Sequence, residues 1–215
     1  MVKRFTRRVM IVASGCVASE VVFPLWSPAE ANPTWLASPR HIDTKLRLGV
    51  IADLHGGLAV DAASRLNVFL DSMSRKDCDA LVQLGDFAFP NAKHQEYADR
   101  LNAAHQRVIH VIGNHEFDFG LKREDCYREW GINASYYACD LKGIRILVLD
   151  GNESGSPVYR GGYPSFIGDE QLAWLEKQLS TCSSPVLILS HQPLAGTSAI
   201  DNASKVQGIL SSHRS

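Results

Sequence analysis

The most constraining feature of the sequence is a series of short apolar runs, each followed directly by polar side chains. Four runs have the length and composition of buried strands: 46–52, 79–85, 107–113 and 185–190. Between them lie segments of helical spacing or composition: 60–75, 91–105 and 168–179. Strands that alternate with helices predict an α/β fold with a largely parallel sheet and helical crossovers.

The rest of the pattern adds a hairpin and a final helix. Residues 135–140 and 143–150 are predicted to pair antiparallel across a Leu-Lys-Gly turn, and residues 201–212 are predicted to form the last helix. The charged and apolar fractions, 21% and 45%, are ordinary for one globular domain.

The polar residues after the four apolar runs carry the candidate chemistry. In chain order they are Asp53, His55, Asp86, Asn114, His115, Glu116 and His191. Ligands bind at the carboxyl ends of strands in parallel sheets, so we expect these side chains to meet in one crevice. Their carboxylate, amide and imidazole groups suit Mn, Fe or Zn, and the lack of cysteine argues against a structural zinc site. Gly85 and Gly113 are predicted to allow sharp turns beside them.

The motif series D-x-H, G-D, G-N-H-E and H resembles the calcineurin-like metallophosphoesterases over roughly residues 46–215. The resemblance implies a four-layer αββα sandwich, in which two mixed sheets are flanked by helices and two metal ions lie at the strand ends. It also implies hydrolysis of a small-molecule phosphoric ester, either a diester or a monoester.

The resemblance assigns a role to each candidate residue. Asp53 and His55 would bind the first divalent ion, and Asp86 would bridge both ions. Asn114 and His191 would bind the second ion. His115 would be catalytic and would not be a ligand, and Glu116 would hydrogen-bond His115 and orient it. Two such ions can hold an in-line phosphoryl displacement and lower the pKa of a shared water to about 7, which makes hydroxide available.

Differences between this sequence and the motifs of related enzymes indicate which branch of the family it resembles most. Purple acid phosphatases have a tyrosine ligand where this chain has Phe89, which cannot bind iron. The stretch 113–120 is similar to 5′-nucleotidases, but the chain has no room for their separate substrate domain. Residues 169–179 and 185–194 are more similar to small single-domain cyclic-nucleotide phosphodiesterases.

The first 31 residues are predicted to be a cleaved export signal. Residues 1–8 carry four basic side chains, a short apolar stretch follows at 9–19, and Ala29 and Ala31 form a small-x-small cleavage pattern. TRRVMI resembles a twin-arginine signal. An uncleaved N-terminal helix and a lipoprotein signal at Cys16 are alternatives. Residues 32–45 read as a linker, and we expect a periplasmic or secreted, bacterial protein.

Charge and cysteine usage exclude some classes of partner. A net charge of -1 gives no basis for a nucleic-acid-binding patch, and the apolar stretches are too short for a transmembrane segment. Four cysteines would remain after cleavage: Cys78, Cys126, Cys139 and Cys182. They form disulfides or buried thiols, and their spacing is not that of a zinc site.

Several polar residues are interpreted as structural. His94 and His105 are expected on the surface of the helix 91–105, and His110 is expected within a strand. Arg160 and Tyr163 are expected in a solvated loop, with substrate contact as the alternative.

The last residues, SSHRS, do not match the G-H-x-H motif that supplies one more ligand to each metal in the family. His213 is therefore expected near a helix end at the surface. We expect the C-terminal part of the domain, including strands of the second sheet, to be missing from this chain. A second functional hypothesis follows, in which a truncated or degenerate family member binds metal or a partner without turnover.

Overall fold

The computed structural model describes residues 46–213 in full, and residues 9–13 and 19–22 as backbone. It contains two four-stranded sheets, ordered β1-β8-β7-β6 and β2-β3-β4-β5. The strands are β1 Val9–Ala13, β2 Ser19–Val22, β3 Arg47–Ile51, β4 Ala80–Gln83, β5 Val108–His110, β6 Tyr137–Leu141, β7 Ile144–Leu149 and β8 Val186–Ser190.

The parallel strands of both sheets have their carboxyl ends at the same end of the molecule. In one sheet β3, β4 and β5 are parallel, with Val50 opposite Val82 and Val82 opposite Ile109. In the other sheet β7 and β8 are parallel and β6 is antiparallel to β7. Both sheets are therefore mixed, because β2 also runs antiparallel to β3. The candidate residues follow the carboxyl ends of these parallel strands.

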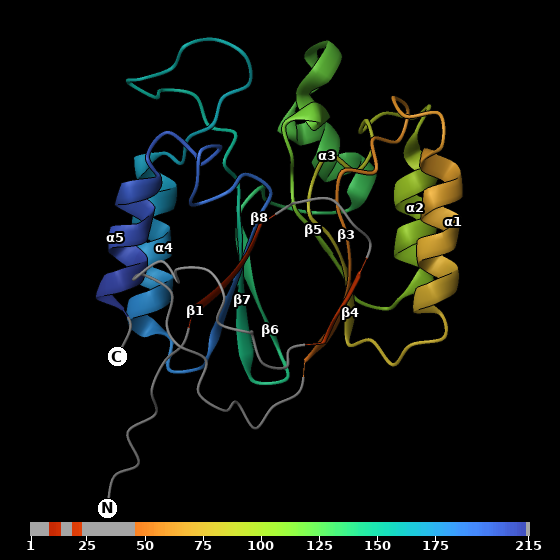
Figure 1. Cartoon of the computed structure of the whole chain (residues 1–215), viewed down its shortest axis with the longest axis horizontal. Coiled ribbons are helices and arrows are strands. Elements are labelled where there is room, and N and C mark those ends of the chain that lie inside the picture. The colour runs from red at the N-terminus through yellow and green to blue at the C-terminus, as the bar shows by residue number, and fades with distance from the viewer. Residues whose placement is uncertain (1–8, 14–18, 23–45, 214–215) are drawn as a thin grey trace, which may run out of the picture.

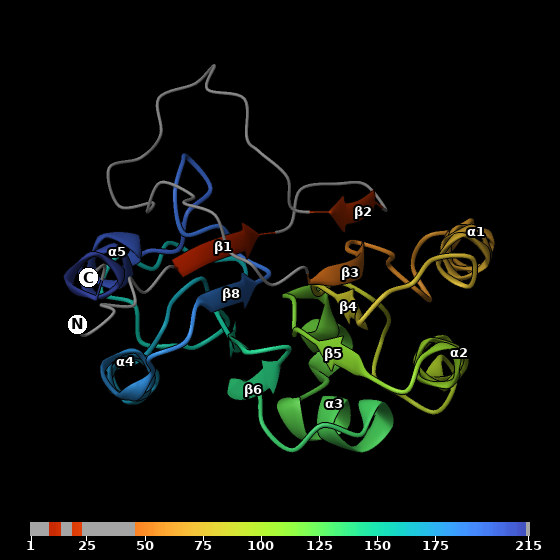
Figure 2. The same ribbon diagram turned by 90° about the horizontal axis from the view of Figure 1, so that it is seen from below.

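The helices cover the outer faces of the two sheets and complete four layers (Figures 1 and 2). They are α1 Ala62–Met73, α2 Gln95–Ala104, α3 Arg123–Trp130, α4 Asp169–Thr181 and α5 Ala203–Ser212, with a 3-10 segment, η1 His115–Gly120. Figure 2 shows α1 and α2 on one side and α4 and α5 on the other, with the sheets between them. The predicted αββα sandwich is confirmed.

Four apolar clusters hold these layers together. Leu48, Val82 and Ile146 belong to the cluster between the sheets. Leu66 and Phe69 of α1 pack outside the first sheet, and further clusters fill the spaces under α4 and α5 and beside α3. Burying each such side chain contributes roughly 1.5–3 kcal/mol, so the interface between the sheets is a rigid support for the strand ends.

The predicted hairpin is confirmed, and its turn has a local cause. Lys142 and Gly143 both have positive φ, at 50° and 75°. This is the backbone of a type I′ turn, whose twist matches that of the two strands it joins. Gly143 tolerates this conformation without steric cost.

The other elements match their predicted positions within a few residues, but two segments were missed. No helix was predicted at 123–130, because α3 is strongly polar and buries only Cys126, Glu129 and Trp130. No strand was predicted in the first 31 residues, yet β1 pairs with β8 and β2 pairs with β3. Apart from those two strands, the predicted export signal and linker, residues 1–45, lie outside the described residues.

The four cysteines after residue 45 are free thiols, and Cys126 and Cys182 are buried. Of the two alternatives, the described residues therefore follow that of small buried thiols. None of the helices in the described part of the chain is long and apolar enough to cross a membrane.

Two histidines were misplaced by the helix prediction. His94 and His105 are the capping residues at the two ends of α2, outside its helical residues, and both are half-buried. His94 packs its ring against Phe89, while the His105 ring nitrogens lie 3.1 Å and 2.9 Å from the carbonyls of Cys78 and Arg107. Both histidines are structural, as predicted, although in other places.

His110 is buried in a hydrogen-bonded network that fixes its tautomer. The Gln83 side chain accepts a hydrogen bond from Gly85 N–H through Oε1, so its amide nitrogen faces His110 Nδ1 at 3.3 Å. Nδ1 therefore accepts, and Nε2–H donates to Asn102 Oδ1 at 2.9 Å. The ring also stacks on Trp130. Burial lowers the pKa of His110 from 6.5 to about 4.

The low pKa of His110 predicts a loss of stability in mild acid. Between pH 6.5 and 4 this histidine binds a proton in the unfolded chain but not in the folded chain, so His110 lowers the free energy of unfolding by up to about 3 kcal/mol. Glu116, whose pKa is raised to about 7, acts with the opposite sign in this range. His110→Asn should lower stability at pH 7.5 and flatten this acid dependence, as measured by urea unfolding at several pH values. An unchanged slope would show that His110 is not the group responsible.

Candidate metal centre

The candidate residues begin on two paired strand ends. Beyond β3 and β4 the backbone stays hydrogen-bonded, with Asp53 N–H donating to Gly85 O at 3.1 Å and His55 N–H donating to Asp86 O at 2.8 Å. Asp53, His55 and Asp86 have φ of 52°, 55° and 50°. They are three of the five non-glycine residues with positive φ in the described part of the chain. Such conformations cost roughly 1–3 kcal/mol each and cluster at functional sites.

Two glycines allow the strand ends to approach closely. Gly85 has a φ of 95°, which confirms the predicted sharp turn, and a Cβ there would lie 2.6 Å from His191 Nδ1. Gly113 has no positive φ, so the chain does not use the left-handed conformation of glycine there. A Cβ at Gly113 would lie 2.2 Å from Asp86 Oδ1, so this glycine is required by the close approach of the strand ends.

Two groups of potential ligand atoms meet at the end of the sheets, and Asp86 belongs to both. One group is His55, Asp86 and His115, and the other is Asp53, Asp86 and His191. Within each group the ligand atoms lie within 4.8 Å of one another. Asn114 completes the cluster, because its Oδ1 lies 3.2 Å from His191 Nε2. The structure thus brings all the candidate residues together.

The grouping differs in detail from the one implied by the family. The resemblance puts Asp53 and His55 on the same ion and leaves His115 out of the ligand set. In the structure Asp53 lies with His191, and His115 lies with His55, whose ring centroid is 4.9 Å from its own. Asp86 is shared under either grouping.

Unsatisfied polar atoms show that the cluster fits divalent ions. In the described part of the chain, three buried side-chain atoms have no hydrogen-bond partner, and two of them are Asp53 Oδ2 and His55 Nδ1. Leaving buried polar atoms unpaired costs about 1–3 kcal/mol each. A cation bound at each ligand group would satisfy them.

The electrostatics of the cluster also favour a cation. Burial alone would raise the pKa of Asp86, but hydrogen bonding and charge from His191, with the backbone N–H of His115, outweigh it and lower that pKa. Burial raises the pKa of Asp53. Burial would lower the pKa of His191, yet Asp86, 3.4 Å away, raises it to about 8. The carboxylates therefore hold a positive charge at His191 when no ion is bound.

The ring orientation of His191, which follows β8, is fixed by a hydrogen bond to the sheet that contains β4. Its Nδ1 donates to Leu84 O at 2.8 Å, across from β8 to the end of β4. This leaves Nε2 facing Asp86 and Asn114. A hydrogen bond from the far ring nitrogen is the usual support for a histidine ligand.

His115 is held by a residue that the sequence reasoning missed. Its Nδ1 donates to Asp118 Oδ2 at 2.8 Å, and Tyr163 donates from its hydroxyl to Asp118 Oδ1 at 2.5 Å. The Tyr163 hydroxyl also lies 3.2 Å from His115 Nδ1. Tyr163 and Arg160 both lie in an exposed loop, as predicted, but the Tyr163 hydroxyl also reaches the site. The spacing of Asp118, three residues after His115, was the available signal.

Glu116 does not contact His115, so its predicted role is wrong. Its buried carboxylate accepts three backbone hydrogen bonds, from Asp86, Phe87 and Gly113, at 2.9, 2.7 and 2.7 Å. It thereby ties the end of β4 to the segment after β5. Burial, with the nearby Asp86, raises the pKa of Glu116 to about 7.

His213 lies outside the cluster. It is the residue that ends α5, as predicted, and neither candidate ligand group contains it. The predicted absence of the C-terminal part of the domain concerns residues after 215 and stays a prediction.

Replacing Glu116 should destabilise the fold. In Glu116→Gln an amide N–H₂ would face backbone N–H donors, so we expect the free energy of unfolding to fall by about 2 kcal/mol. Thermal unfolding should show a melting temperature lower by roughly 6 °C, while Glu124→Gln, at an exposed position, melts like the wild type. Wild-type melting of Glu116→Gln would contradict the structural role.

Replacing Asp86 should remove both metal ions. Because Asp86 is common to both groups, Asp86→Asn should reduce the manganese content from two ions per chain to less than one, by elemental analysis after dialysis. The exposed Asp71→Asn is the control and should keep two. Retention of two ions by Asp86→Asn would rule out Asp86 as the shared ligand.

Comparison with known proteins agrees with the fold. A family model described as calcineurin-like phosphoesterase matches residues 46–214. A dimetal phosphatase from Danio rerio aligns at 21% identity over 78% of each chain, with a TM-score of 0.61. A single mutant of Vps29 from Entamoeba histolytica, at 17% identity over 72% of this chain and 79% of that one, has a TM-score of only 0.34 and supports no inference. No curated protein matches the sequence. The chain belongs to the calcineurin-like phosphoesterase family.

Proposed function

We propose that this chain hydrolyses phosphoric esters with the help of two divalent metal ions held by Asp53, His55, Asp86, Asn114 and His191. The single observation that carries the proposal is the pair of ligand groups that share Asp86, with His115 beside them. Family membership supports phosphoester hydrolysis that depends on metal, and the ligand types suit Mn, Fe or Zn.

The metal ions and the buried residues that hold them would have different roles in the reaction. Bound divalent ions would activate water and offset negative charge on the phosphoryl group. Asp86, 4% exposed, and His191, 5% exposed, lie at the base of the site, where water is largely excluded and electrostatic interactions are strong.

His115 is placed to give a proton to the leaving alcohol. With Nδ1–H held by Asp118, the ring presents Nε2 toward Asp86, 3.9 Å from Oδ2. Water adds its oxygen to phosphorus and loses a proton, and the bond from phosphorus to the ester oxygen breaks. That oxygen takes a proton from Nε2 of the doubly protonated His115 ring, and the proton lost by water replaces it. The products are an alcohol and a phosphate, or a phosphomonoester when the substrate is a diester.

Monoester and diester substrates both fit this chemistry. The sequence similarity to small cyclic-nucleotide phosphodiesterases favours a diester. Rates on a cyclic nucleotide, a nucleoside monophosphate and a nitrophenyl diester would rank the two classes.

The activity test uses His115 to separate catalysis from metal binding. With manganese, the wild type should hydrolyse nitrophenyl phosphate or bis(nitrophenyl) phosphate, and chelation should abolish the reaction. His115→Ala should lower kcat about 10²–10⁴-fold while keeping two ions, because a general acid is lost and no ligand is. His213→Ala, outside the site, should keep wild-type kcat.

Two results would count against the proposal. If His115→Ala lost an ion, His115 would be a ligand, as its position beside His55 and Asp86 allows. If wild-type protein with two bound ions hydrolysed none of these esters, the chain would instead be a family member that binds metal without turnover.

We also propose that the protein is exported and cleaved after Ala31, which would remove the edge strands β1 and β2 and leave sheets ordered β8-β7-β6 and β3-β4-β5. The basic residues 1–8, the apolar stretch that follows and the pattern ending at Ala31 support this. The N-terminal sequence of the protein isolated from its own cells should begin at Asn32, and an intact Met1 terminus would contradict cleavage.

A further inference from the structure

A pocket beside the metal centre is formed by the connection between β7 and α4. It has a volume of about 420 Å³ and is lined by Tyr159, Arg160, Tyr163, Ser165 and Asp201, among others. We call it the Tyr159 pocket. Its volume lies within the range of pockets that hold small molecules, roughly 300–1,000 Å³.

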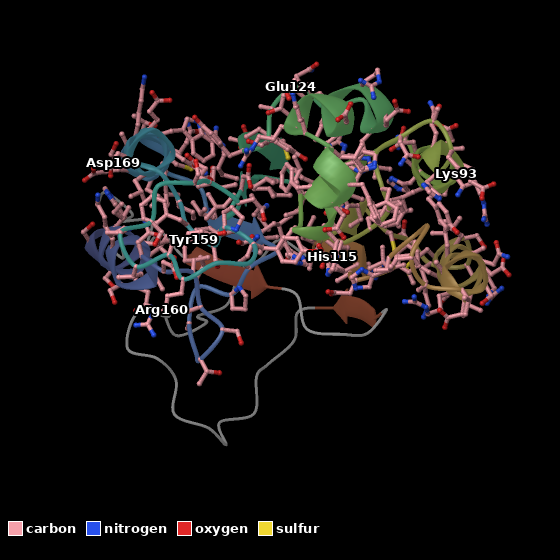
Figure 3. The ribbon with its side chains drawn as sticks, turned by 90° about the horizontal axis from the view of Figure 1, so that it is seen from above. Lys93, His115, Glu124, Tyr159, Arg160 and Asp169 are labelled. Carbon is pink, nitrogen blue, oxygen red and sulfur yellow. The ribbon has the colours of Figure 1, made fainter. Side chains whose placement is uncertain are left out.

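The Tyr159 pocket adjoins the proposed proton donor through a shared wall. Tyr163 lines the pocket, and the same side chain contacts both His115 and Asp118. Its ring centroid lies 5.1 Å from that of His115. Figure 3 shows Tyr159 on the connection that passes between α4 and the segment carrying His115. An organic group attached to an ester oxygen near His115 would therefore extend toward this pocket.

The connection that forms the pocket is fixed at its base. Phe166 N–H donates to Gly151 O at 2.7 Å, which joins its two ends, and Asp201 N–H donates to Ser165 O at 2.7 Å. At the tip, Gly161 and Gly162 reverse the chain with φ of 99° and 85°. The pocket is thus largely formed without a ligand, which reduces the entropy lost on binding.

The two tyrosines offer ring surface and not hydroxyl groups. The Tyr159 hydroxyl donates to Gly162 O at 2.6 Å, and the Tyr163 hydroxyl donates to Asp118. Both rings are nevertheless substantially exposed, at 52% and 43%. Rings held by their hydroxyl groups are suited to stack on a planar ring of a ligand.

The charged side chains of the pocket add hydrogen-bonding groups of both kinds. Within the described residues, Arg160 forms no ion pair and no side-chain hydrogen bond, so its guanidinium can donate to a ligand. Asp201 supplies acceptor oxygens. Their charges cancel, so the pocket does not favour a second phosphate group. A neutral planar ring with donors and acceptors, as in a nucleobase, fits this lining.

We propose that the Tyr159 pocket binds the base of a nucleoside phosphate ester and makes such esters the preferred substrates. The inference rests on the proposed function, because it places the organic part of the ester that His115 would protonate. It predicts that a base attached to the sugar phosphate adds affinity, and that Tyr159 supplies much of it.

Equilibrium dialysis tests binding separately from turnover. Adenosine 5′-monophosphate and ribose 5-phosphate differ only in the base, and both are measured on the full chain with manganese at 4 °C, and again with chelator. The wild type should bind the nucleotide at least tenfold more tightly. Tyr159→Ala should lower nucleotide affinity about tenfold and leave the affinity for ribose 5-phosphate within twofold. Tyr159→Phe, which keeps the ring, should restore most of the preference.

The matched control is Phe119→Ala, which removes another exposed ring, 87% exposed, that does not line the Tyr159 pocket. It should leave the preference for the nucleotide unchanged. Equal binding of the two ligands by the wild type would overturn the proposal, as would an equal loss of both in Tyr159→Ala. Loss of preference in Phe119→Ala alone would place the base elsewhere. Absence of hydrolysis with the preference intact would refute the proposed function and leave the pocket assignment standing.

Discussion

The hydrogen bond from His191 Nδ1 to Leu84 O is the contact on which the site depends. It joins the end of β8 to the end of β4, so it crosses from one sheet to the other at 2.8 Å. Because one ring nitrogen is used in this way, the other must face Asp86. Gly85 leaves the space for the ring, and a side chain at that position would collide with it. This one interaction therefore couples the position of a candidate ligand to the packing of the two sheets.

Hydrogen bonds to two acidic residues, Glu116 and Asp118, fix the other parts of the site. Glu116 binds three backbone N–H groups, and Asp118 holds His115. The two acidic residues after His115 thus have different tasks: one fixes the backbone and the other fixes a ring. The strained backbone at Asp53, His55 and Asp86 is tolerated because the segments after β3 and β4 are hydrogen-bonded to each other, and Glu116 accepts from Asp86 N–H.

Much of the fold and the identity of the cluster could be predicted from the sequence. Buried strands read clearly as apolar runs, and a parallel sheet brings the residues after such runs to one edge. The roles of Glu116, Gly113 and Tyr163 could not be predicted, because each depends on a contact between distant segments, such as that between Tyr163 and Asp118, which are 45 positions apart in the sequence. The helix α3 was missed because few of its residues are apolar, and tertiary packing of Trp130 and Cys126 decides its position.

The central claim is that Asp86 lies between two metal ions. Crystals grown with manganese, measured at the manganese absorption edge, would locate the ions directly by anomalous scattering. We expect two peaks about 4 Å apart, both within coordination distance of Asp86, with His191 and Asn114 beside one of them. A single peak, or two peaks of which only one contacts Asp86, would contradict the account.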